Sequence, residues 1–82
     1  MYIEIITPDK LVYSGNITSA KLPGSEGSFG VLKNHAPMIA TLGTGEIKLT
    51  DEQKNVHTFR TEGGVVEVLN NNLTVLAEKL GE

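Results

Sequence analysis

The 82-residue chain has no cysteine and no tryptophan, and its only aromatic residues are two tyrosines and two phenylalanines. Without cysteine there is no disulfide framework and no zinc site with thiolate ligands. Small secreted domains often depend on disulfides, so this absence favours a reducing, cytosolic compartment. The shortage of aromatic rings leaves valine, isoleucine and leucine to build a modest hydrophobic core.

Positive charge is also scarce, because seven lysine and arginine residues stand against ten acidic ones and the net charge is −3. Neutralising a phosphate backbone requires a basic patch, so this balance argues against nucleic acid as a partner. No cluster of basic residues indicates a membrane surface. Residues 1–20 lack the pattern of a signal peptide, and no apolar run reaches the length of about 18 residues that spans a bilayer. We therefore expect no direct insertion into a membrane.

What the chain does contain is a series of short β-type segments separated by turn residues. Ile47 and Leu49 alternate with polar neighbours, which is typical of a strand with one buried face. We expect turns at Ser14-Gly15-Asn16, Gly43-Thr44-Gly45 and Asn70-Asn71-Asn72. No segment has capped i, i+3, i+4 apolar spacing, so no helix is expected. The sequence predicts a single all-β domain over residues 1–82, a sandwich or a barrel.

Residues 22–40 are unusual because they hold three glycines, two prolines and a histidine between two expected strands. Glycine reaches backbone angles that other residues avoid, and proline fixes φ and removes a donor. This composition indicates a shaped docking surface. The segment contains neither a nucleophile paired with a base nor a cluster of metal ligands, so it does not indicate chemistry.

Candidates for catalysis or cofactor binding are weak elsewhere too. His35 has no acidic or cysteine neighbour within four residues, and His57 lies in an expected strand, where an ordinary polar role is the simpler interpretation. The glycine-rich run at residues 24–30 lacks the lysine and the following helix of a phosphate loop. The carboxylates show no spacing that would pair them: Asp51, Glu26, Glu62 and Glu67. We expect no catalytic residue, no cofactor and no metal.

Seven motifs occur in order along most of the chain. They are Thr7-Pro8, Tyr13-Ser14-Gly15, Leu22-Pro23-Gly24-Ser25-Glu26-Gly27-Ser28-Phe29-Gly30-Val31-Leu32, Asn34-His35-Ala36-Pro37, Gly45-Glu46-Ile47, Gly63-Gly64-Val65-Val66-Glu67-Val68 and Asn72-Leu73-Thr74-Val75-Leu76-Ala77. Each motif alone is weak, but the ordered set strongly resembles the ε subunits of F-type ATP synthase, which are called δ in mitochondria. The resemblance implies a flattened sandwich of about ten short, mostly antiparallel strands.

The resemblance also implies a non-catalytic rotor subunit of the central stalk, located on the cytoplasmic face of the membrane. Such a subunit docks on the γ subunit and on the ring of c subunits, and it couples proton or sodium ion flow to ATP synthesis. The residues that match the surface toward the c ring are Glu26, Gly27, Ser28 and Phe29. Some members are acidic at the position of Ser28, which leaves Glu26 as the expected acidic contact. The residues that match the surface toward γ are His35, Ala36, Pro37 and Met38.

Typical bacterial members continue into two inhibitory C-terminal helices, and the chain resembles a short form without them. A small ligand-binding β-barrel is the main alternative function, and it would require an enclosed apolar cavity. A hydrolase that uses His35 would require a carboxylate about 3 Å from a ring nitrogen. A nucleic-acid-binding barrel is disfavoured by the charge and by the shortage of aromatic residues.

Overall fold

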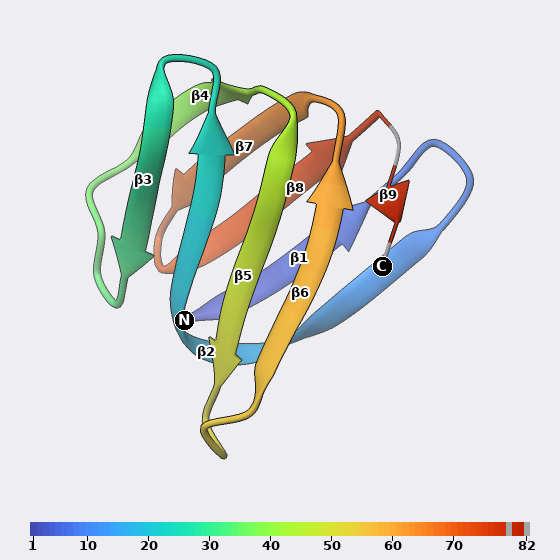
Figure 1. Ribbon diagram of the computed structural model, residues 1–82. Helices are drawn as coiled ribbons and strands as arrows, with labels where there is room; N and C mark the ends of the chain where they lie inside the picture. The colour runs from blue at the N-terminus through green and yellow to red at the C-terminus, as the bar shows by residue number, and fades with distance from the viewer. Residues whose placement is uncertain (79, 82) are drawn as a thin grey trace.

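The computed structural model describes residues 1–78, 80 and 81. This part of the chain forms nine strands and no helix (Figure 1). The strands are β1 (Tyr2–Ile6), β2 (Leu11–Gly24), β3 (Gly27–Leu32), β4 (Met38–Leu42), β5 (Gly45–Asp51), β6 (Val56–Thr61), β7 (Gly64–Leu69), β8 (Asn72–Ala77) and β9 (Leu80–Gly81). Over the described residues, no helix is long and apolar enough to cross a membrane.

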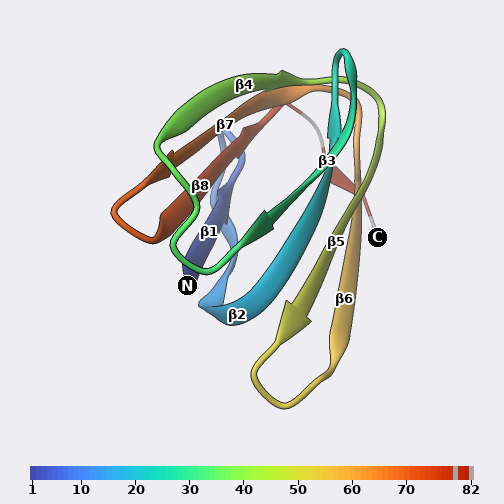
Figure 2. The same cartoon turned by 90° about the vertical axis from the view of Figure 1, so that its left-hand side faces the viewer.

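The strands form two layers that share the long strand β2 (Figures 1 and 2). The first half of β2 pairs with β1, and the first layer continues through β8 and β7 to β4. The second half of β2 pairs with β3 on one side and β5 on the other, and the second layer continues through β6 to β9. All pairings are antiparallel except that between β1 and β8. The expected flattened, mostly antiparallel sandwich is confirmed, with nine strands over the described residues.

Of the expected turns, the one at residues 14–16 is wrong, and the one at residues 43–45 exists but does not form the expected hairpin. Residues 14–16 lie inside β2, which runs without interruption for 14 residues. Residues 16, 15 and 14 pair in register with residues 2, 3 and 4 of β1. This pairing, on the edge of β1 that does not face β8, holds them extended. The Gly43-Thr44-Gly45 segment is not a hairpin, because it carries the chain from β4 in one layer to β5 in the other. A Cβ atom at Gly45 would lie 2.7 Å from Cβ of Pro23, so the close approach of β2 excludes a side chain there.

The expected asparagine hairpin is confirmed between β7 and β8. Asn70 and Asn71 adopt φ angles of 50° and 62°, in the left-handed region that asparagine tolerates better than most residues. Between the layers lies a core built almost entirely from aliphatic side chains, as the composition predicts. Fully buried members include Ile3, Ile5, Ile17, Leu22, Val31, Ile47, Leu49, Val66, Val68, Leu73 and Val75. The alternation predicted for Ile47 and Leu49 is confirmed.

Candidate partner-binding surfaces

The turn between β2 and β3 presents the residues expected to face the c ring. Gly27 has a φ of 131°, and a Cβ atom at Gly24 would lie 2.5 Å from the carbonyl oxygen of Gly27, so both positions require glycine. Glu26, Gly27 and Ser28 are exposed, whereas Phe29 is half-buried and packs against the core. The structure therefore places three of the four residues on the surface, with Phe29 anchoring the strand beneath them.

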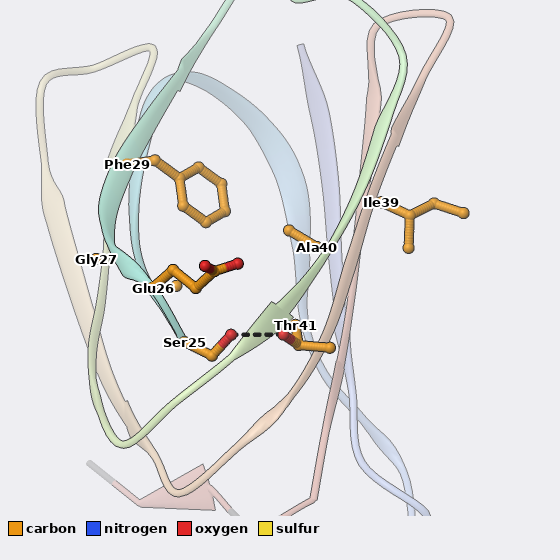
Figure 3. A pocket seen from close by; sticks show the side chains of 8 residues that line it. Ser25, Glu26, Gly27, Phe29, Ile39, Ala40 and Thr41 are labelled. Atoms are coloured by element: carbon orange, nitrogen blue, oxygen red, sulfur yellow. Dashed lines mark hydrogen bonds between the residues drawn. The ribbon is translucent and has the colours of Figure 1, made fainter.

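Strand β4 holds this turn in place from the other layer. The backbone N–H of Ser25 donates to the carbonyl oxygen of Thr41 at 3.0 Å, and the two hydroxyl groups share a hydrogen bond of 2.6 Å (Figure 3). The backbone N–H of Gly43 also donates to the carbonyl oxygen of Pro23 at 2.8 Å. These bonds join the two layers where β2 and β4 share the single pair Gly24–Leu42. These hydrogen bonds thus hold in place the turn that contains the exposed Glu26.

The residues expected to face γ lie in the loop that follows β3 and at the first position of β4, at the opposite end of β3 from the turn (Figure 1). Asn34, the second residue of the loop, has a φ of 63°, and its N–H donates to the Oδ1 atom of Asn71 at 2.9 Å. Ala36 and Pro37 are exposed, whereas Met38 is half-buried against the core. The two predicted surfaces are therefore separated by the length of β3 and could serve two partners.

Among the described residues, His35 has no carboxylate partner of the kind that a catalytic histidine requires. Its Nδ1–H donates to the carbonyl oxygen of Ala36 at 2.7 Å, and no carboxylate of the described residues forms an ion pair with it. The described part of the chain also contains no group of three or more potential metal ligands. The contact between His35 and a carboxylate, on which the hydrolase alternative depends, is thus not formed among the described residues.

The histidine that does meet a carboxylate is His57, a pairing that the sequence analysis missed. Its Nε2–H donates to the Oδ2 atom of Asp51 at 2.9 Å, and its ring packs against that of Tyr13 with centroids 5.1 Å apart. Asp51 also accepts hydrogen bonds from the N–H groups of Gln53 and Asn55, both at 2.9 Å.

The His57 hydrogen bond, together with these backbone bonds, lowers the pKa of Asp51. Burial raises the pKa of Tyr13, and the charge of Asp51 adds to that shift. The carboxylate fastens the β5–β6 hairpin, which is a structural role.

A further surface that the sequence analysis missed is the outer face of the first layer, on strands β4, β7, β8, β1 and the start of β2. Thr41, Val65, Leu76, Ile6 and Leu11 are successive cross-strand partners and form a row across all five strands. Val65 is 38% exposed, and Leu76 and Leu11 are each 52% exposed. We call this surface the apolar face.

Further exposed apolar residues lie on this face, all on one side of that row. Ile39 on β4 is 72% exposed, and its side chain points away from those of Phe29 and Glu26 (Figure 3). Tyr2 and Leu69 are also exposed and each pairs with Asn72, two rows away from the first row and separated from it by the row that contains Thr74. Exposed apolar side chains that lie side by side on several strands make this face a candidate protein–protein interface. The sequence signal was present in β7 and β8, whose residues are apolar at positions of both parities.

The charges on the apolar face have one sign. Glu67 and Glu4 both pair with Thr74, so they lie on either side of it in the row next to the apolar one. Among the described residues, the strands of this layer place no lysine or arginine at the positions that alternate with the core. A complementary partner would therefore present apolar side chains with basic residues beside them.

Comparison with known proteins identifies the family. Residues 1–81 match the family described as "ATP synthase, Delta/Epsilon chain, beta-sandwich domain". The chain is 44% identical over 78 residues to the ATP synthase epsilon chain of Leptospira borgpetersenii, with 93% of this chain and 59% of that one covered. It is 41% identical over 76 residues to the ATP synthase epsilon chain of Chlorobium limicola, with 93% and 86% covered.

A solved structure shares the fold. The match is a chain in the central stalk and c-ring structure of the Tetrahymena thermophila mitochondrial ATP synthase, with a TM-score of 0.83 and 23% identity over 99% of this chain and 65% of that one. The chain spans a little under 60% of the length of the Leptospira relative. The family match and the two curated relatives together establish that the chain belongs to the δ/ε family of ATP synthase subunits and has its β-sandwich domain.

Proposed function

We propose that the chain is a non-catalytic subunit of the central stalk, which docks on γ through the apolar face and on the c ring through the β2–β3 turn. Membership of the δ/ε family indicates that the complex is ATP synthase. The Tetrahymena match is a structure of a central stalk with its c ring. The observation that carries the proposal is the row across five strands that is apolar on four of them, because a monomeric domain of this size gains nothing from exposing it.

The γ surface expected from the sequence joins the apolar face at β4. Met38 immediately precedes Ile39, and the loop containing His35, Ala36 and Pro37 leads into that strand. Because Met38 is half-buried in the core, its substitution by aspartate would disturb folding as well as docking. Ile39 is the better probe of the same contact, since most of its side chain lies in solvent.

The β2–β3 turn supplies the second contact. Its acidic residue Glu26 is exposed at the tip, and the bonds from Ser25 to Thr41 limit the movement of that tip. A braced turn suits a rotor subunit, because force passes between partners only through contacts that do not yield. Peripheral attachment of this kind would hold the domain at the cytoplasmic face of the membrane without insertion.

Calorimetry with F1 from the same organism tests the proposal. Saturable binding of one chain per γ-containing F1, together with no binding to F1 that lacks γ, is the expected result. Equal binding to both preparations would overturn the assignment of γ as the docking partner. Because the described residues show no catalytic site, we also expect no ATP hydrolysis by the isolated chain.

A further inference from the structure

The outer face of the second layer, opposite the apolar face, carries two lysines in direct opposition. Lys21 on β2 and Lys48 on β5 are cross-strand partners in the antiparallel ladder, and both side chains are exposed. Like charges at directly opposed positions of a sheet repel each other. This pair therefore costs the folded domain stability unless something negative lies between them.

No negative group of the described residues fills that role. The Asp51 carboxylate bonds to His57 and to neither lysine. The nearest acidic residue in register on this face, Glu46, is the cross-strand partner of Arg60, not of Lys48. The face is thus basic in a chain whose net charge is −3.

The lysines border a hollow. Gly30 is the partner of Lys21 on its other side, and a Cβ atom there would meet nothing closer than the carbonyl oxygen of Ala20 at 3.8 Å. The absence of a side chain at Gly30 leaves a space of about 450 Å³ whose lining includes Ser19, Lys21, Ser28, Leu32, Lys48 and Thr50. Two lysines and three hydroxyl-bearing residues are therefore among the residues that border this open hollow, together with apolar ones.

We propose that this hollow binds an oxyanion of the phosphate type, such as a polyphosphate or a phosphorylated headgroup. Lys21 and Lys48 supply charge-assisted hydrogen bonds to its oxygens, and the surrounding hydroxyl groups act as neutral donors. The anion offsets the repulsion between the two lysines, so binding also stabilises the fold. The site lies on the layer opposite the proposed γ surface, and it does not depend on docking to γ.

Titration of the domain with inorganic pyrophosphate tests the proposal, with amide chemical shifts recorded by NMR at constant ionic strength. We expect saturable shifts centred on residues 21, 30 and 48. Lys48→Gln should weaken binding about tenfold, which corresponds to one lost charge-assisted contact of about 1.4 kcal/mol. Lys54→Gln, at the exposed tip of the β5–β6 hairpin, is the matched control and should leave the affinity unchanged.

A stability measurement provides an independent readout. At low salt and without ligand, Lys48→Gln should be more stable to urea than the parent chain, since it removes the repulsion. Shifts that do not saturate, or equal effects of Lys48→Gln and Lys54→Gln on affinity, would overturn the proposal. Destabilisation by Lys48→Gln would also contradict it, because the lysine would then serve the fold.

Vesicle sedimentation distinguishes the two sources of phosphate. Phosphatidylglycerol vesicles that retain the parent chain but release Lys48→Gln, with phosphatidylcholine vesicles as control, would identify a lipid headgroup. Pyrophosphate binding without vesicle retention would identify a free phosphate compound. Failure in both arms would refute the site, while γ binding in calorimetry would be unaffected.

Discussion

The apolar face makes a quantitative prediction about docking. Leu11 and Leu76 lie at outward positions of β2 and β8, each beside Ile6, and each is 52% exposed. Fully burying a leucine side chain contributes about 1.5–3 kcal/mol, so the half still exposed on each can contribute about 1 kcal/mol to a complex. The double substitution Leu11→Ala/Leu76→Ala should therefore cost about 2 kcal/mol of binding free energy, or about thirtyfold in Kd.

Calorimetry with γ-containing F1 measures this loss directly. Val56→Ala is the matched control, because Val56 is 53% exposed but lies on the second layer. Urea unfolding of each variant should show that stability changes much less than binding. A double variant that binds as tightly as the parent chain, or a Val56→Ala variant that loses as much affinity, would refute the argument for this face.

Three other changes probe the turn, the backbone and the hairpin. Glu26→Lys should weaken proton-driven ATP synthesis in membranes while γ binding persists, and normal synthesis would contradict a contact with the c ring. Gly64→Ala should destabilise the domain by about 2–5 kcal/mol in urea unfolding, because its φ is 147° and its Cβ atom would lie 2.3 Å from the carbonyl oxygen of Leu76. The parent chain should lose stability relative to Asp51→Asn as the pH falls below about 4, because the folded-state pKa of Asp51 is lower than its ordinary value of 3.8 and its hydrogen bond to His57 favours the ionised form. Parallel acid profiles for the two chains would contradict that assignment.

Local patterns in the sequence predict those features that depend on neighbouring residues. The alternation around Ile47 and Leu49 identifies a half-buried strand, and the Asn70–Asn72 segment identifies a hairpin, because each signal lies within a few positions. The turn expected at residues 14–16 fails because a distant strand, β1, holds that segment extended. Tertiary pairing outweighed the local preference for a turn.

Surfaces composed of several strands are harder to predict. The row from Thr41 through Leu76 to Leu11 exists only once the register of four strand pairs is known. The contact between His57 and Asp51 likewise depends on the geometry of the β5–β6 hairpin. Sequence resemblance located the β2–β3 turn and the loop after β3, because each of these is a contiguous segment with its own glycine, proline or asparagine signature.

Site-specific photo-crosslinking in the assembled ATP synthase tests the central claim most directly. A benzophenone side chain is placed in turn at Ile39 on the apolar face, at Glu26 on the β2–β3 turn and at Thr58 on the outer face of the second layer, and the products are identified by mass spectrometry. The account predicts products with γ from position 39, products with subunit c from position 26, and neither product from position 58. Products with γ from position 58 and none from position 39 would contradict it.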